Sequence, residues 1–193
     1  MSLQDVMLEE LRDLYSAENQ LLKALPKLAK AAEDEDLKQA FTSHLEQTRG
    51  QVERLKKVFE LLDEKPTGKH CNGMEGLIEE GEEAIDEDEE GSLYDIRLIG
   101  AAARVEHYEI AGYTAVIAMA NGLGLSKISG YLDANLREED ETRGLLEEKL
   151  DELIEQSAGE SNTDEEKHEN AAPARKQSKS VPASKAVAKK KVR

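Results

Sequence analysis

The sequence predicts an all-α protein, folded as an antiparallel four-helix bundle with a long crossover between its second and third helices. Apolar residues recur at alternating steps of three and four over four segments, at about residues 3–32, 36–63, 93–121 and 126–156. This spacing places them on one face of a helix. Short polar turns join the first segment to the second and the third to the fourth, whereas a much longer connection separates the second from the third. Two helical hairpins joined by a crossover account for this pattern.

The first predicted helix carries a stripe of apolar and small residues that is broken at one position. The stripe consists of Leu11, Leu14, Leu21, Leu25, Leu28 and Ala32. Glu18 occupies the one place in it where an apolar residue is expected. A single Glu on such a stripe is weak evidence of a site, because its stem can follow the edge of the core while its carboxylate reaches water.

The second predicted helix has a polar middle. Its apolar stripe consists of Leu37, Phe41, Leu55, Val58 and Leu62. The polar residues on or beside that stripe are His44, Gln47, Thr48 and Gln51. Pro66 and Gly68 end the helix, because both residue types interrupt helices. The long connection that follows contains a short helix near residues 74–85 and an acidic stretch at 86–90.

The third and fourth predicted helices are interrupted in the same way. The third presents Ile99, Ala102, Tyr113, Val116 and Ala120, with Glu106 and Glu109 among them. The fourth presents Ile128, Leu132, Leu146, Leu150 and Leu153, with Glu139 and Thr142 among them. All four stripes are therefore broken by polar residues near mid-length, and the helix order is that of a ferritin-like bundle.

The inward polar groups converge on one level of the bundle. At about 1.5 Å per residue, the carboxylates of Glu18, Glu106, Glu109 and Glu139 lie at similar depths from the hairpin turns. Four carboxylates in a dry core repel one another and must take up protons or bind cations. Two divalent ions neutralise four carboxylates, and the spacing Glu106-x-x-Glu109 is that of paired ligands in di-iron and di-manganese bundles. The sequence therefore predicts a two-metal site, with iron the favoured metal and manganese the alternative.

The second helix leaves its metal ligand open. A Glu-x-x-His pair is the usual arrangement there, but this chain has His44-x-x-Gln47, with Gln51 one turn further. A neutral amide oxygen is a poorer ligand for iron than a carboxylate, and His44 and Gln51 are about 10 Å apart along the helix axis. His44 is either a ligand or a core histidine bonded to a carboxylate. For Tyr113, core packing is favoured over a hydrogen bond to a ligand.

The charge distribution separates an acidic body from a basic tail. The net charge is −16, yet residues 172–193 hold eight Lys and Arg and no acid. Residues 1–171 then carry 26 − 8 = 18 basic against 42 acidic residues, a net charge of −24. Because hydrophobicity falls after Ser157, we expect a folded domain over 1–156 and a disordered tail over 157–193. The tail is either a solubilising extension or an arm that contacts DNA phosphates without sequence preference.

Composition excludes several classes of protein. No segment approaches the roughly 20 apolar residues that a membrane-spanning helix needs, and the start of the chain does not have the basic and apolar regions of a secretion signal. Cys71 is the only cysteine, so no internal disulfide can form. We therefore expect a cytoplasmic protein without membrane association.

Four segments resemble the YciE/YciF family of bacterial proteins: Leu14–Leu21, His44–Thr48, Met74–Glu80 and Val105–Ala111. The likeness covers about residues 3–155 and leaves out the basic tail. It implies a ferritin-like fold similar to that of rubrerythrins, a role in stress responses, a di-metal centre and a homodimer. The metal ligands that the resemblance implies are Glu18, His44, Gln51, Glu106, Glu109 and Glu139. The family commonly has Glu where this chain has Gln47.

Three functions are compatible with these features. The chain could be a di-iron or di-manganese oxidoreductase acting on peroxide, oxygen or Fe(II). It could instead bind metal for storage or buffering under stress, although nothing in the sequence indicates a large storage shell. The third function is association with nucleic acid through residues 172–193, with the bundle as a dimerising body.

Overall fold

The computed structural model describes residues 1–67 and 69–170, with side chains described as far as residue 158. It divides the chain into two compact units, Met1–Gly159 and Glu160–Arg193. Residues 172–193 lie outside the described residues. They are the basic part of the tail, which is predicted to be disordered and to be either a solubilising extension or an arm that contacts DNA.

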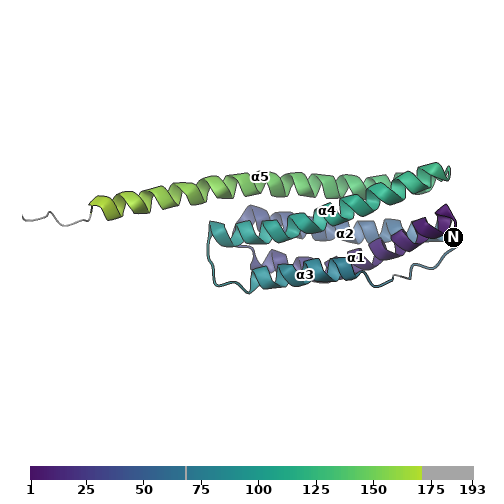
Figure 1. The fold of residues 1–193 in the computed structure, drawn as a ribbon, viewed down its shortest axis with the longest axis horizontal. Coiled ribbons are helices and arrows are strands. Elements are labelled where there is room, and N and C mark those ends of the chain that lie inside the picture. The colour runs from purple at the N-terminus through teal and green to yellow at the C-terminus, as the bar shows by residue number, and fades with distance from the viewer. Residues whose placement is uncertain (68, 171–193) are drawn as a thin grey trace, which may run out of the picture. The chain divides into compact units, whose positions relative to one another are not determined.

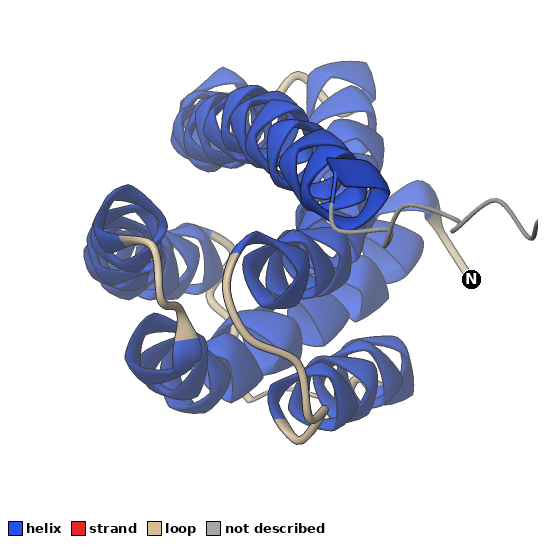
Figure 2. Ribbon diagram, turned by 90° about the vertical axis from the view of Figure 1, so that its left-hand side faces the viewer, coloured by secondary structure: helices blue, strands red, loops and turns tan. Residues whose placement is uncertain are grey.

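All the described secondary structure is helical (Figures 1 and 2). The helices are α1 (Leu3–Ala31), α2 (Glu35–Leu61), α3 (Asn72–Ile85), α4 (Ser92–Gly122) and α5 (Ser126–Asn170). The all-α fold class is therefore confirmed, and α3 lies in the crossover as predicted. The last helix runs beyond the expected end at residue 156. Its extension is rich in Glu, a good helix former, and the next proline is Pro173.

Within residues 1–159 the long helices lie side by side (Figures 1 and 2). α1 and α2 form a hairpin, and α3 packs against both α1 and α4. Among these described helices none is long and apolar enough to cross a membrane.

Asp95 joins the first hairpin to the start of α4. Its buried carboxylate accepts hydrogen bonds from the backbone N–H of Glu33 at 3.0 Å and of Asp34 at 2.7 Å. Asp34 is itself the N-cap of α2, accepting from the N–H of Leu37 at 2.8 Å. Both ends of the α1–α2 turn are thus held against α4, which sets the relative height of the polar residues on these helices.

The core consists of two apolar layers with a polar layer between them. The first apolar layer includes Leu21, Leu25, Leu37, Phe41, Leu98 and Leu146. The second includes Met7, Leu11, Leu55, Phe59, Val116 and Leu132. Because residues such as Leu21 and Leu11 lie on one helix on either side of Glu18, the polar groups of the four long helices occupy the interval between the layers.

Gly112 allows α1 to approach α4 closely beside this polar layer. A Cβ at residue 112 would lie 2.7 Å from Cδ2 of the buried Leu14. We therefore expect Gly112→Ala to lower the free energy of unfolding by about 1–3 kcal/mol through overpacking. Gly100→Ala is a matched control on the same helix, because a Cβ there meets nothing within 4 Å. It should raise the free energy of unfolding by about 0.5–1 kcal/mol. Urea unfolding of both variants tests this, and shifts of the same sign would contradict it.

Candidate metal centre

The polar layer brings together inward side chains from all four long helices. Each is at most 4% exposed, and they are Glu18, His44, Thr48, Gln51, Glu106, Glu109, Asn135, Glu139 and Thr142. Every one of the six residues predicted as metal ligands is therefore buried at this level. Burying charged or polar groups is costly unless they are paired or bind a cation, so the layer needs a physical explanation.

Four of the predicted ligands form one cluster. His44, Glu106, Glu109 and Glu139 each offer a ligand atom, and these four atoms lie within 4.8 Å of one another. The His44 Nε2 atom is 3.2 Å from Glu106 Oε1 and 3.7 Å from Glu139 Oε2. Neither contact has the geometry of a hydrogen bond. Three carboxylates and one imidazole thus face a common point.

The other ring nitrogen of His44, Nδ1, is in contact with two polar side chains on the side away from the cluster. This atom lies 3.1 Å from the Thr142 hydroxyl oxygen and 3.4 Å from Gln47 Oε1. Thr142 donates to Gln47 Oε1 at 3.3 Å, so its oxygen is free to accept from Nδ1–H. A proton on Nδ1 leaves the lone pair of His44 on Nε2, where the cluster lies. Metal-binding histidines are commonly oriented by such a bond on the other nitrogen.

The remaining predicted ligands, Glu18 and Gln51, lie outside this group of four. Glu18 Oε1 accepts a hydrogen bond from the Tyr113 hydroxyl, and its charge contributes to raising the pKa of Glu109. Both side-chain amide atoms of Gln51 are buried without a hydrogen-bond partner in the described part of the chain. The ring of Tyr113 packs in the second apolar layer, as favoured from the sequence, but its hydroxyl also binds the carboxylate.

Burial governs the ionisation of the carboxyl groups. It raises the pKa of Glu18 to about 8, against a hydrogen bond from Tyr113 that lowers it. Burial also raises the pKa of Glu109 and Glu139 well above the usual range, and neighbouring carboxylates add to both shifts. For His44, burial lowers the pKa, but the Glu106 carboxylate more than offsets this, so that its pKa is raised. The protein part of the site thus attracts positive charge, either as protons or as metal ions.

Several buried atoms of the polar layer have no hydrogen-bond partner among the described residues, and their chemistry shows whether a metal ion fits there. Within the described residues the following buried atoms have no hydrogen-bond partner: Glu18 Oε2, His44 Nε2, Glu106 Oε2 and both carboxylate oxygens of Glu109 and Glu139. Most buried polar atoms in proteins are satisfied, so these are exceptions gathered in one place. Carboxylate oxygens with an imidazole nitrogen suit divalent iron or manganese. The donor set therefore fits a metal centre.

Two residues that were not predicted from the sequence also belong to this region, Asn135 within the polar layer and Arg54 at its edge. Asn135 is fully buried, and its side-chain amide donates to the Tyr113 hydroxyl at 2.8 Å. Arg54, which is partly exposed, donates to Asn135 Oδ1. Asn135 lies four residues before Glu139 on the inward stripe of α5, and this position is the one signal that could have identified it.

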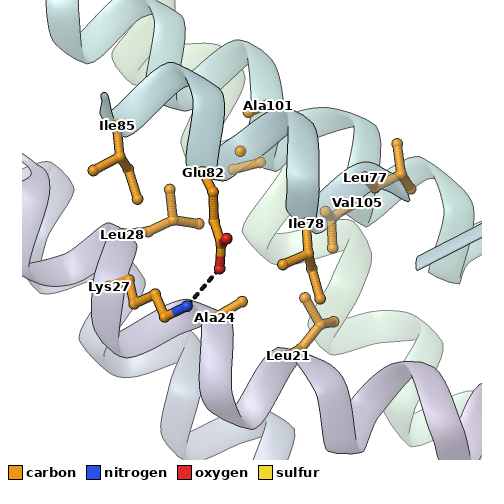
Figure 3. A pocket seen from close by; sticks show the side chains of 12 residues that line it. Leu21, Ala24, Lys27, Leu28, Leu77, Ile78, Glu82, Ile85, Ala101 and Val105 are labelled. Atoms are coloured by element: carbon orange, nitrogen blue, oxygen red, sulfur yellow. Dashed lines mark hydrogen bonds and ion pairs between the residues drawn. The ribbon is translucent and has the colours of Figure 1, made fainter. Parts of the chain in front are cut away.

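Two other features lie apart from the cluster. A largely apolar pocket between α1, α3 and α4 has the ion pair of Lys27 and Glu82 among its lining residues (Figure 3). Its other lining residues are aliphatic or glycine. Cys71 is buried and donates to Asp13 Oδ2 at 3.0 Å. Burial raises the pKa of this thiol, and it serves as the N-cap of α3.

The fold and the cluster together define the class of the protein: a helical bundle with a buried histidine–glutamate cluster that could hold a metal ion. Residues 2–159 match the family described as "Domain of unknown function (DUF892)", and the chain belongs to this family. It is 46% identical over 142 residues to Protein YciF of Escherichia coli (strain K12), a match that covers 73% of this chain and 86% of that protein. The predicted resemblance to the YciE/YciF family is thereby confirmed.

Solved structures agree with the fold. The crystal structure of the E. coli stress protein YciF has a TM-score of 0.78 at 42% identity, covering 80% of this chain and 98% of that one. YcfI from Rhodopseudomonas palustris has a TM-score of 0.74 at 43% identity, covering 76% and 94%. A protein from Xanthomonas campestris, XCC3681, has a TM-score of 0.64 at 18% identity, covering 83% and 99%, and shows likeness of fold alone.

Proposed function

We propose that the chain is a metal-binding protein whose bundle holds two divalent ions, iron in the first place and manganese as the alternative. The observation that carries this proposal is the group of buried carboxylate oxygens without partners around His44 Nε2. His44, Glu106, Glu109 and Glu139 are the ligands of the central cluster. Glu18 contributes its free Oε2, and Gln51 contributes a weaker amide ligand.

Charge balance supports two ions rather than one. Glu18, Glu106, Glu109 and Glu139 bring four negative charges when ionised, and two divalent cations neutralise them. One neutral imidazole completes the set without changing the charge. When bound, such a pair of ions would supply redox chemistry toward oxygen or peroxide. We therefore propose that the protein has oxidase- or peroxidase-type activity in addition to metal binding. The protein residues orient the ligands, and the two apolar layers keep water from the site.

The biological setting is proposed from the relatives. YciF of E. coli is described as a stress protein, and we place this chain in a bacterial stress response. A cytoplasmic homodimer is the expected state. A second function, contact of residues 172–193 with DNA, is favoured by their eight basic and no acidic residues. It would operate beside metal binding, because every proposed ligand lies outside that segment.

Loss of metal in a double variant tests the proposal. Glu106→Ala combined with Glu139→Ala removes two carboxylates from facing helices α4 and α5. We expect the wild-type protein to retain two Mn²⁺ or Fe²⁺ ions per chain after anaerobic loading and gel filtration, measured by elemental analysis. The double variant should lose stoichiometric binding. As a control, Glu147→Ala with Glu148→Ala removes two exposed carboxylates from α5 and should leave the metal content unchanged. Retention of two ions by the first variant would contradict the site.

A further inference from the structure

A series of four hydrogen-bonded residues crosses the bundle and ends at Glu18. Arg54 of α2 donates from Nε to Asn135 Oδ1 of α5, and Asn135 Nδ2 donates to the Tyr113 hydroxyl of α4 at 2.8 Å. Tyr113 donates in turn to Oε1 of Glu18 on α1. Each of the four long helices therefore contributes one residue to this hydrogen-bonded series. Its outer end reaches the surface, because the Arg54 side chain is 22% exposed, while the other three residues are fully buried.

Arg54, at the outer end of the series, determines which atom donates and which accepts in each of its hydrogen bonds. A guanidinium group has only donors, so the atom of Asn135 that faces Arg54 must be the carbonyl oxygen. The amide nitrogen of Asn135 then faces Tyr113 and donates to it. With its oxygen already accepting, the Tyr113 hydroxyl directs its proton to Glu18. Arg54 is itself fixed by an ion pair with Glu138 on α5.

These hydrogen bonds leave the two oxygens of the Glu18 carboxylate in different environments. Oε1 is engaged by Tyr113, whereas Oε2 is buried and has no partner among the described residues. We propose that Arg54, Asn135 and Tyr113 are positioning residues that hold Glu18 with one oxygen bound and the other free for a metal ion. This inference rests on the proposed metal-binding function and adds the residues that orient one ligand from outside the ligand set.

Positioning can be separated from packing by a substitution that keeps the ring. Tyr113→Phe retains the aromatic ring in the second apolar layer and removes only the hydroxyl. Tyr108→Phe is a matched control on the same helix. The Tyr108 hydroxyl also donates to a carboxylate, Asp13 Oδ2 at 2.8 Å, but Asp13 is not among the proposed ligands. Asn135→Leu, which keeps the branched shape and the number of side-chain heavy atoms, removes the donor to Tyr113 and provides a second variant should Tyr113→Phe fold poorly.

Titration of the full-length protein with Co²⁺, followed by its visible absorption, tests the inference. Tyr113→Phe should raise the Kd of at least one ion about 10- to 100-fold, as loss of an orienting partner does at other metal sites, and should alter the Co²⁺ spectrum. Asn135→Leu should change both in the same direction, and Tyr108→Phe should change neither. An unchanged Kd and spectrum in Tyr113→Phe, or equal losses in Tyr108→Phe, would overturn the inference. Absence of Co²⁺ binding by the wild-type protein would instead overturn the proposed function.

Discussion

Replacing Glu109 by methionine should stabilise the metal-free protein while removing the stabilisation that metal provides. Glu109 is fully buried, and neither of its carboxylate oxygens has a partner in the described part of the chain. An apolar side chain of similar length avoids that cost. Replacing buried charged groups by well-packed apolar ones is worth up to about 1–4 kcal/mol, and each kcal/mol shifts Tm by about 2–4 °C in a protein of this size.

Thermal unfolding with and without metal measures both parts of this prediction. In EDTA, Glu109→Met should melt above the wild-type protein. With Mn²⁺ the order should reverse, because a ligand at a thousandfold excess over Kd stabilises the wild type by about 4 kcal/mol. Glu148→Met, an exposed substitution on α5, should change the free energy of unfolding by less than about 0.5 kcal/mol. A metal-free Glu109→Met protein that melts below the wild type would show that this carboxylate is satisfied without metal.

The second large effect is the dependence of metal stabilisation on pH. The pKa of Glu18 rises from an ordinary 4.5 to about 8 in the folded protein. A group with a raised folded pKa contributes stability that is present below its ordinary pKa and is lost as pH rises through the folded pKa. His44 also has a raised pKa, so its contribution falls in the same direction. The metal-free protein should therefore lose stability from Glu18 between about pH 4.5 and 8, and from His44 as pH rises above its ordinary pKa of 6.5.

Metal binding should depend on pH in the opposite sense. Protons compete with metal ions for the same carboxylates, so binding strengthens as pH rises. The difference in Tm between the Mn²⁺-loaded and EDTA-treated protein should consequently widen from about pH 5.5 to about pH 8. In the Glu106→Ala and Glu139→Ala double variant the difference should stay near zero throughout. A wild-type difference that is constant over this range, or that narrows as pH rises, would contradict a buried carboxylate site.

Much of the fold was predictable because it depends on local patterns. Steps of three and four among apolar residues marked α1, α2, α4 and most of α5, and Pro66 with Gly68 marked the end of the first hairpin. The predicted end at residue 156 was based on the loss of apolar residues. Such a loss removes the packing of a helix but does not stop the helix itself, and α5 continues to Asn170.

The candidate site was predictable to the extent that its members break an apolar stripe. Glu106, Glu109 and Glu139 were found in this way, and the structure places them with His44 in one cluster. The roles of Gln47 and Asn135 could not be predicted from spacing, because they depend on contacts between residues far apart in sequence. Gln47 meets Thr142 across 95 positions, and Asn135 meets Arg54 across 81.

Diffraction from crystals of the Mn²⁺- or Fe²⁺-loaded protein, measured at the absorption edge of the metal, would locate directly any metal ions bound in the bundle. We predict two anomalous peaks per chain in the polar layer between the apolar layers. One peak should lie within coordination distance of His44 Nε2 and the carboxylates of Glu106, Glu109 and Glu139. The other should lie within coordination distance of Glu18 Oε2. Peaks found only on the acidic surface, with none in the polar layer, would show that the buried carboxylates are not a metal centre.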